Sequence, residues 1–281
     1  MAKQKNTKSP DEMSFLDHLE ELRWHLIRSV AAVVIIGIVA FVFSSFVFDV
    51  IIFGPKNMDF PTYRLFCNIA TSVGMESDFC KDELPFTIQS RTMGGQFSAD
   101  IWTAIWVGFV VGFPYVLWEM WKFISPGLRE NERKNSRGFI LIASLLFFLG
   151  VLFGYYVVAP LSINFLGTYQ VSEEVLNEFD IGSYIGAVRA SVIACGILFE
   201  LPIIIFFLTK VGLITPEIMK KYRKIALVIV LILSAVITPP DVTSQIIVAI
   251  PVLILYQISI YISKMVLKGE AKRQQKNLKV K

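Results

Sequence analysis

Charged residues, histidine and cysteine are all scarce in this chain of 281 residues. Only 18% of the residues are charged and 54% are apolar, whereas soluble domains have about 25% charged and about 45–50% apolar residues. The chain has two histidines and three cysteines. This composition argues against a soluble enzyme, a disordered regulator and a disulfide-rich secreted miniprotein.

Catalytic and nucleotide-binding motifs are also missing. The histidines, His18 and His25, lie in or beside the polar N-terminal leader, and the sequence has no HExxH or GxSxG motif. It has no GxxxxGK[ST], GxGxxG or CxxC motif either, which disfavours ATP-driven transport and redox chemistry. We therefore expect no enzymatic activity, no cofactor, no metal site and no nucleic-acid partner.

Long apolar blocks are present instead. A helix needs roughly 20 apolar residues to cross a bilayer, and four blocks reach that length while two are shorter. The expected spans are Trp24–Phe53, Ile101–Ile124, Phe139–Leu166, Ile185–Thr209, Ile225–Ile237 and Ile246–Ile262. The sequence thus predicts an all-α polytopic membrane protein with a single six-span domain over residues 1–281, whose last two spans are short.

Lysine and arginine are distributed unevenly between the two sides of such a bundle. Most of the 27 lie in the leader, the 2–3 loop, the 4–5 loop and the C-terminal tail at residues 265–281. By the positive-inside rule, both termini are cytoplasmic. Residues 14–23 are expected to form a cytoplasmic amphipathic helix that turns into the first span, and residues 54–97 form the outer loop.

The outer loop contains Cys67 and Cys80, thirteen residues apart. On that side of the membrane, oxidising enzymes can join them in a disulfide. Two unrelated free thiols in a flexible loop are the alternative. Three GxxxG spacings begin at Gly108, Gly150 and Gly182, and they indicate close helix packing at most.

Carboxylates lie on a side that is otherwise basic. Glu20 and Glu21 precede span one, and Glu130 and Glu132 follow span two after the helix-breaking Pro126-Gly127. Local ion pairs and helix-dipole compensation explain them in one interpretation. In the other, two separated carboxylate sites bind a partner with two adjacent guanidiniums, because arginine binds carboxylates bidentately.

Two further polar sites lie within or between the later spans. Glu200 lies near the middle of span four, where a carboxyl group costs roughly 2.5–3.5 kcal/mol. It is either a protonated structural residue or part of a polar surface for a partner or a translocating chain. Asp241 is expected to cap span six, and Gln245 lies one turn inside it.

Four ordered motifs in the chain resemble those of one family, TatC, the signal-peptide receptor subunit of the twin-arginine protein translocase. They are Phe15-Leu-Asp-His-Leu-Glu-Glu-Leu-Arg23, Trp121-Lys-Phe-Ile-Ser-Pro-Gly-Leu128 with Glu132-Arg133, Phe199-Glu-Leu-Pro202 and Thr238-Pro-Pro-Asp-Val-Thr-Ser-Gln245. The resemblance covers about residues 14–265. It implies a glove-shaped bundle in a prokaryotic cytoplasmic (inner) membrane, which exports folded proteins with TatA-type partners and the proton-motive force.

The resemblance also assigns roles to individual residues. Glu21 and Glu132 match the glutamates implicated in twin-arginine recognition, and Arg23 and Phe123 match their neighbours. The other matches are Glu200 for the intramembrane glutamate of the concave face, and Asp241 and Gln245 for the site of TatA-type contact. A multimeric complex is implied, with a TatB-type subunit left open.

Two features depart from the family pattern: the outer loop is long, and Glu119 stands where glutamine is common. A proton-coupled secondary transporter that uses Glu200 is the alternative function. The absence of an internal repeat counts against that alternative. An intramembrane enzyme comes third, because it lacks candidate catalytic residues.

Overall fold

A computed structural model describes residues 15–74, 80, 83–124, 136–172 and 174–278, with side chains described for 19–74, 80, 83–124, 138–172 and 174–269. These residues form two compact units. The first unit is drawn from residues 1–45 and 97–145, and the second from residues 46–96 and 146–281. Each unit is described by itself below.

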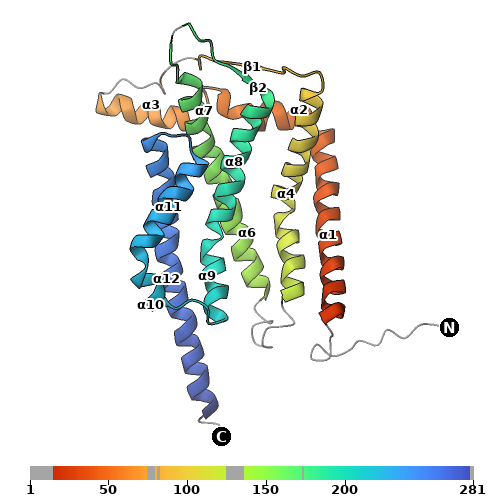
Figure 1. The fold of residues 1–281 in the computed structure, drawn as a ribbon, viewed down its shortest axis with the longest axis vertical. Coiled ribbons are helices and arrows are strands. Elements are labelled where there is room, and N and C mark those ends of the chain that lie inside the picture. The colour runs from red at the N-terminus through yellow and green to blue at the C-terminus, as the bar shows by residue number, and fades with distance from the viewer. Residues whose placement is uncertain (1–14, 75–79, 81–82, 125–135, 173, 279–281) are drawn as a thin grey trace, which may run out of the picture. The chain divides into compact units, whose positions relative to one another are not determined.

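The first unit contains α1 (Phe15–Val42), most of α4 (Gly95–Ile124) and the beginning of α6 (Ser136–Phe153). Helices α1 and α4 run side by side (Figure 1). Glycines allow this close approach: a Cβ on Gly108 would lie 2.4 Å from the carbonyl oxygen of Val33, and one on Gly37 would lie 3.1 Å from that of Ala104. Helix backbones approach this closely only where small residues face each other.

The second unit contains most of the remaining elements. Within it, helix α12 packs on α9 and on α11, and helix α8 packs on η6 and on α7. Their bounds are η2 (Val47–Ile52), η3 (Gly54–Lys56), α3 (Pro61–Val73), β1 (Thr87–Gln89), η6 (Gly154–Val158), α7 (Ala159–Thr168), β2 (Glu178–Asp180), α8 (Ile181–Phe199), α9 (Leu201–Lys210), α10 (Pro216–Lys221), α11 (Arg223–Ile237) and α12 (Val242–Leu278). A three-residue helix, α2 (Ser44–Phe46), lies where the two units meet in the sequence.

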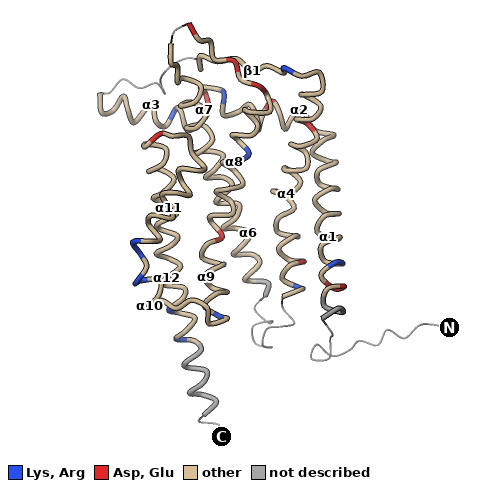
Figure 2. The backbone as a smooth tube through the Cα atoms, viewed as in Figure 1, with Lys and Arg blue, Asp and Glu red and all other residues tan. Residues whose placement is uncertain are grey.

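The helical membrane fold predicted from the sequence is confirmed. Five helical segments of the described chain are long and apolar enough to cross a membrane: Leu19–Val42, Gly95–Ile124, Gly138–Thr168, Ile181–Lys210 and Val242–Gly269. The remaining predicted span corresponds to α11, whose 15 residues are fewer than the roughly 20 that a span needs. The count of six spans and the orientation of the termini therefore stay predictions. Figure 2 shows that Lys, Arg, Asp and Glu are rare along the middle of the long helices.

The structure changes the expected start of span one. Helix α1 runs without a break from Phe15 to Val42, so the predicted turn after residue 23 is wrong. The stretch from Phe15 to Arg23 has no proline or glycine and is rich in leucine and glutamate, residues that favour a continuous helix.

Two other spans are interrupted near prolines. Span four is divided into α8 and α9 at Glu200, two residues before Pro202. The third span contains the π-helical turn η6 directly before Ala159-Pro160. Proline removes a backbone donor and clashes with the carbonyl four residues earlier, which explains local departures from regular α-helix.

The outer loop at residues 54–97 contains regular structure. Helix α3 occupies its first half, and β1 pairs in parallel with β2 in the register Thr87 with Glu178 and Gln89 with Asp180. The two-stranded sheet is a small addition to an otherwise helical fold. It joins the outer loop to the connection before α8.

Two of the three GxxxG spacings mark close packing. Gly150 and Gly154 lie against the backbone of α8, where added Cβ atoms would come within 2.5 Å of the carbonyl oxygens of Cys195 and Ser191. Gly108 and Gly112 lie against α1. The third spacing does not pack on a helix of the described chain: no described atom lies within 4 Å of a Cβ on Gly186, and only the Asp180 side chain lies near one on Gly182.

The close packing at Gly154 and the open space around Gly186 provide a matched pair of variants. We expect Gly154→Ala to lower the free energy of unfolding by about 1–3 kcal/mol, since the methyl group collides with a backbone carbonyl that cannot move away. Gly186→Ala is expected to be neutral or stabilising by up to about 1 kcal/mol, because alanine favours the helix more than glycine does. Thermal unfolding in detergent measures both, and equal melting temperatures would contradict the packing described.

Candidate functional site

The candidate site lies at the N-terminal end of α1 and the C-terminal end of α4, within the first unit. Glu21, His25 and Ser29 follow one another at intervals of four residues and are less exposed than the residues around them. This spacing places the three side chains on one face of α1. That face is directed at α4, because His25 contacts both Glu119 and Phe123 of that helix.

Glu119 is the centre of a buried ionic network. Glu119 is only 1% exposed, and its two carboxylate oxygens have different partners. Oε2 lies 2.6 Å from Nδ1 of His25, and Oε1 accepts a hydrogen bond of 2.7 Å from Nζ of Lys122. Nη1 of Arg28 is 3.8 Å from Oε2. A buried carboxylate needs such partners, since an unpaired one is strongly destabilising.

Aromatic rings surround the partners of Glu119. Nζ of Lys122 lies 3.9 Å from the centroid of the Trp118 ring, in cation–π geometry. The ring of Phe123 meets the His25 imidazole edge-on, with centroids 6.4 Å apart. The network is thus held between α1 and α4 from several directions.

Glu21 differs from Glu119 in both burial and pairing. It lies one helical turn before His25 on the same face of α1 and is only half-buried. No hydrogen bond or ion pair joins Glu21 to any residue that the structure describes. Among the described residues, the site therefore has one carboxylate whose charge is compensated and a second, Glu21, without a charged partner.

The other predicted members of this site are placed unequally. Phe123 is half-buried against His25, while Arg23 is exposed on α1. Glu132, the second predicted carboxylate, lies outside the described residues. Sequence reasoning missed the network of His25, Glu119 and Lys122, although Lys122 three residues after Glu119 at the end of an apolar span was a usable signal.

Glu200 is the only acidic residue within the candidate span Ile181–Lys210. It is 8% exposed and occupies the junction between α8 and α9, where its carbonyl oxygen accepts backbone hydrogen bonds from Ile203 and Ile204. Its Oε1 is buried and has no hydrogen-bond partner within the described part of the chain. One oxygen of this carboxyl group is therefore a buried polar atom without a hydrogen-bond partner among the described residues.

Asp241 and Gln245 stabilise the hairpin of α11 and α12. Oδ2 of Asp241 accepts a 2.8 Å hydrogen bond from the backbone N–H of Ser244, which makes Asp241 the N-cap of α12. Nε2 of Gln245 donates to the carbonyl oxygen of Leu231 at 3.0 Å. Both side chains thus bind their own chain.

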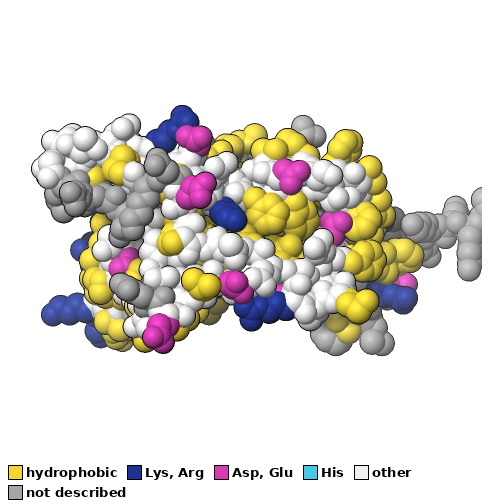
Figure 3. Space-filling view, turned by 90° about the horizontal axis from the view of Figure 1, so that it is seen from above, with side chains coloured by type: hydrophobic (Ala, Val, Ile, Leu, Met, Phe, Trp, Pro, Cys, Tyr) yellow, Lys and Arg dark blue, Asp and Glu magenta, His cyan; other side chains and the backbone are white. Residues whose placement is uncertain are grey.

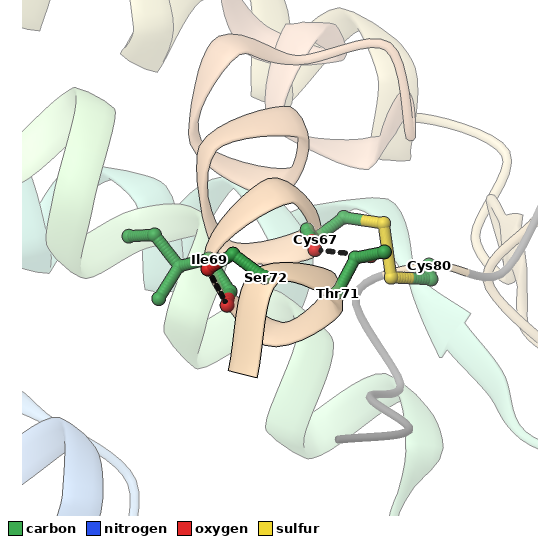
Figure 4. Close-up of a disulfide and its surroundings, with 5 residues drawn as sticks. All are labelled: Cys67, Ile69, Thr71, Ser72 and Cys80. Carbon is green, nitrogen blue, oxygen red and sulfur yellow. Dashed lines mark hydrogen bonds between the residues drawn. A yellow bond between two sulfur atoms is a disulfide. The ribbon is translucent and has the colours of Figure 1, made fainter. Parts of the chain in front are cut away.

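A disulfide joins Cys67 of α3 to Cys80 in the outer loop (Figure 4). Cys195 is a buried free thiol in α8. Among the residues with described placement, no group of three His, Cys, Asp or Glu side chains is arranged to hold a metal ion.

Comparisons with known proteins match this architecture and these motifs. The sequence model of the family described as Sec-independent protein translocase protein (TatC) matches residues 17–251. The chain belongs to the TatC family. It is accordingly a component of a protein translocase and not an enzyme.

Similar proteins cover nearly the whole chain. A TatC protein of Blattabacterium sp. subsp. Periplaneta americana is 46% identical over 92% of this chain and 97% of its own. One from Aquifex aeolicus is 34% identical over 90% and 95%. A crystal structure described as the twin arginine translocase receptor TatC is 33% identical, covers 89% of this chain and 99% of its own, and superposes with a TM-score of 0.64.

The Glu119 network predicts how this TatC chain responds to mutation. We expect Glu119→Ala to lower the free energy of unfolding by about 1–3 kcal/mol, because His25 and Lys122 lose their buried acceptor. Glu119→Gln keeps one carbonyl acceptor and should lose less. Thermal unfolding in detergent measures the difference, with Glu20→Ala on the exposed side of α1 as control. A Glu119→Ala protein as stable as wild type would contradict a structural role for the network.

The Asp241 cap predicts a pH dependence. Partial burial raises the pKa of this carboxyl group, but hydrogen bonds from Ser244 and Thr243 outweigh it and hold the pKa below its ordinary value. The stabilisation is therefore fully present above the unfolded-state pKa of about 3.9 and is lost as the pH falls through the lower folded-state value. Asp241→Ala should cost about 1 kcal/mol at neutral pH and remove this pH dependence, whereas Asp241→Asn should keep most of the cap. Unfolding measured at neutral and acidic pH tests both variants.

Proposed function

We propose that this chain binds the twin-arginine signal peptides of folded precursor proteins, with Glu21 as a principal acceptor of arginine. The observation that carries the proposal is the carboxylate of Glu21, which has no partner among the described residues and lies one helical turn before His25, a partner of the buried Glu119. The names of the similar structures, which are described as twin arginine translocase receptors, support it.

The electrostatics of the site favour a guanidinium ligand at Glu21. Both oxygens of Glu119 are occupied by His25 and Lys122, so Glu119 has little capacity for a further cation. No described residue binds either oxygen of Glu21, and a carboxylate binds arginine through two parallel hydrogen bonds. A lysine ammonium lacks this planar, two-pronged geometry, which explains a preference for arginine.

Glu132 is the second proposed acceptor, so that two carboxylates receive two adjacent arginines. Arg23 and Phe123 are proposed as neighbours that limit how the peptide approaches, Arg23 by its positive charge and Phe123 by its ring against His25. The apolar segment of the signal peptide then lies along the bundle. The resemblance of these positions to the family motifs supports all four assignments.

The remaining proposed roles concern assembly and transport. Glu200 provides a polar position inside the membrane, and Asp241 and Gln245 belong to the surface that contacts TatA-type subunits. The chain would act in a multimeric complex in the inner membrane, with or without a TatB-type subunit, powered by the proton-motive force and with both termini cytoplasmic. A topology reporter attached to the chain tests the orientation, in wild type and in a variant whose loop Lys and Arg residues are replaced by acidic ones.

A proton-coupled secondary transporter is the second candidate, because the buried Oε1 of Glu200 has no hydrogen-bond partner among the described residues. An unsatisfied intramembrane carboxyl group is a common feature of proton pathways. Solute uptake by the purified chain alone in liposomes, abolished by Glu200→Gln, would favour this function. Absence of uptake together with signal-peptide binding would favour the translocase receptor.

The decisive experiment is photo-crosslinking of a signal peptide to the purified protein in nanodiscs. We expect labelling by an Arg-Arg peptide to exceed labelling by the matched Lys-Lys peptide at least tenfold, since one lost bidentate pair is worth about 1.4 kcal/mol or more. Glu21→Ala/Glu132→Ala should abolish this preference.

Glu20→Ala is the matched control, because Glu20 is the adjacent carboxylate on the exposed side of α1. It should label like wild type. If labelling is the same for the Arg-Arg and Lys-Lys peptides, and the same for wild type and Glu21→Ala/Glu132→Ala, the proposed site is refuted and the transporter is favoured.

A further inference from the structure

Helix α3 is anchored by its first turn to a proline-containing stretch of the third span. Pro160 has no N–H, so it cannot donate an α-helical hydrogen bond to the carbonyl of Tyr156 four residues earlier. The hydroxyl of Thr62 donates a hydrogen bond to that carbonyl. The hydroxyl of Tyr63, which is fully buried, lies 2.8 Å from the carbonyl oxygen of Pro55 and 2.9 Å from that of Pro160, and its single proton serves these two acceptors.

These contacts hold α3 against the third candidate span. Tyr156 and Pro160 belong to the candidate span Gly138–Thr168, in its half towards Thr168. Nearby tyrosine hydroxyls bind carbonyls at the end of η2: Tyr155 binds Ile51 and Tyr184 binds Ile52. Tyrosines of this kind gather where the hydrocarbon core meets the headgroups.

The axis of α3 lies across the long helices of its unit rather than along them (Figure 1). Its 13 residues measure about 20 Å, which is too short to cross a hydrocarbon core of about 30 Å. A helix in this orientation and at this level lies in the plane of the interface.

One side of α3 carries an apolar stripe that no part of the described chain covers. Leu65, Ile69 and Val73 are 58%, 50% and 67% exposed and recur every four residues. The polar side carries Arg64, Asn68 and Thr71. Figure 4 shows Ile69 directed away from the Cys67–Cys80 disulfide, which lies on the other side of the helix.

We propose that α3 is an interfacial helix whose stripe of Leu65, Ile69 and Val73 inserts into the lipid surface, at the headgroup–acyl boundary of the outer leaflet. An amphipathic helix buries its apolar face by about 5–10 Å in that layer. Of the described side chains at the end seen in Figure 3, acidic and basic ones are scattered among apolar ones.

The disulfide has a specific part in this arrangement. Hydrogen bonds from Thr62 and Tyr63 hold only the first turn of α3. Cys67 lies just over one turn further along, and its bond to Cys80 ties this part of the helix to the outer loop. The helix is thereby restrained from rotating, so its stripe stays directed at the lipid. The proposal requires only that the long helices span a membrane and does not depend on signal-peptide binding.

Lipid quenching in nanodiscs tests this proposal. A dansyl-bearing amino acid is incorporated at position 69 or, as the matched control, at position 68, in full-length protein with the disulfide intact and one chain per disc. Phosphatidylcholine with a nitroxide near the headgroup should quench the dansyl group at position 69 at least threefold more than at position 68. Aqueous iodide should show the reverse preference.

Two results would overturn the proposal. Equal quenching at both positions would show that the stripe does not face lipid. Protection of position 69 from both quenchers would show that protein covers it, and since each disc holds one chain, that protein would be the chain itself. The melting temperature of each labelled protein, compared with wild type, confirms that the label has not unfolded the unit.

Discussion

Every backbone polar group within a bilayer needs a partner inside the protein, because lipid offers none. This constraint accounts for the local structure wherever the long helices are irregular. Pro160 cannot donate an α-helical hydrogen bond to the Tyr156 carbonyl, and Thr62 from another segment donates one. Tyr155 and Tyr184 do the same for carbonyls of Ile51 and Ile52 at the end of η2. The outer elements of the second unit are therefore held together by hydrogen bonds from side-chain hydroxyls to backbone carbonyls at helix ends and helix breaks.

The same constraint applies to charge. Glu119 is buried at the end of α4, where its carboxylate is stable only with its partners His25 and Lys122. These contacts join α1 to α4 on the face that carries Glu21 one turn away. A rigid pair of helices fixes where Glu21 is presented, and a preorganised carboxylate binds a guanidinium with less entropy loss than a mobile one. Structural pairing and the proposed recognition are thus two uses of one helix face.

Much of the described surface is apolar, as a membrane protein requires, so exposure of a leucine carries little information by itself. The stripe on α3 is informative because its helix lies across the spans and is anchored at the level of the tyrosines. Close helix contacts, in contrast, occur where glycine removes the side chain, as at Gly108 and Gly154. Lipid-facing and protein-facing surfaces follow from residue size and position together.

The sequence by itself determined the helical membrane fold, the family and the positions of most helices, because apolar blocks of bilayer length and several ordered motifs are local signals. It also pointed to Glu21, Glu200, Asp241 and the cysteine pair. It did not predict the continuity of α1, the helix and strand of the outer loop, or the partners of Glu119, and the structure does not describe Glu132. Those partners were decided only by the tertiary structure: His25 and Glu119 are 94 residues apart in the chain, and no periodicity within one helix specifies which face of another it meets. The open or paired state of a carboxylate depends on such contacts, since burial and partners, rather than residue type, set whether its charge is available.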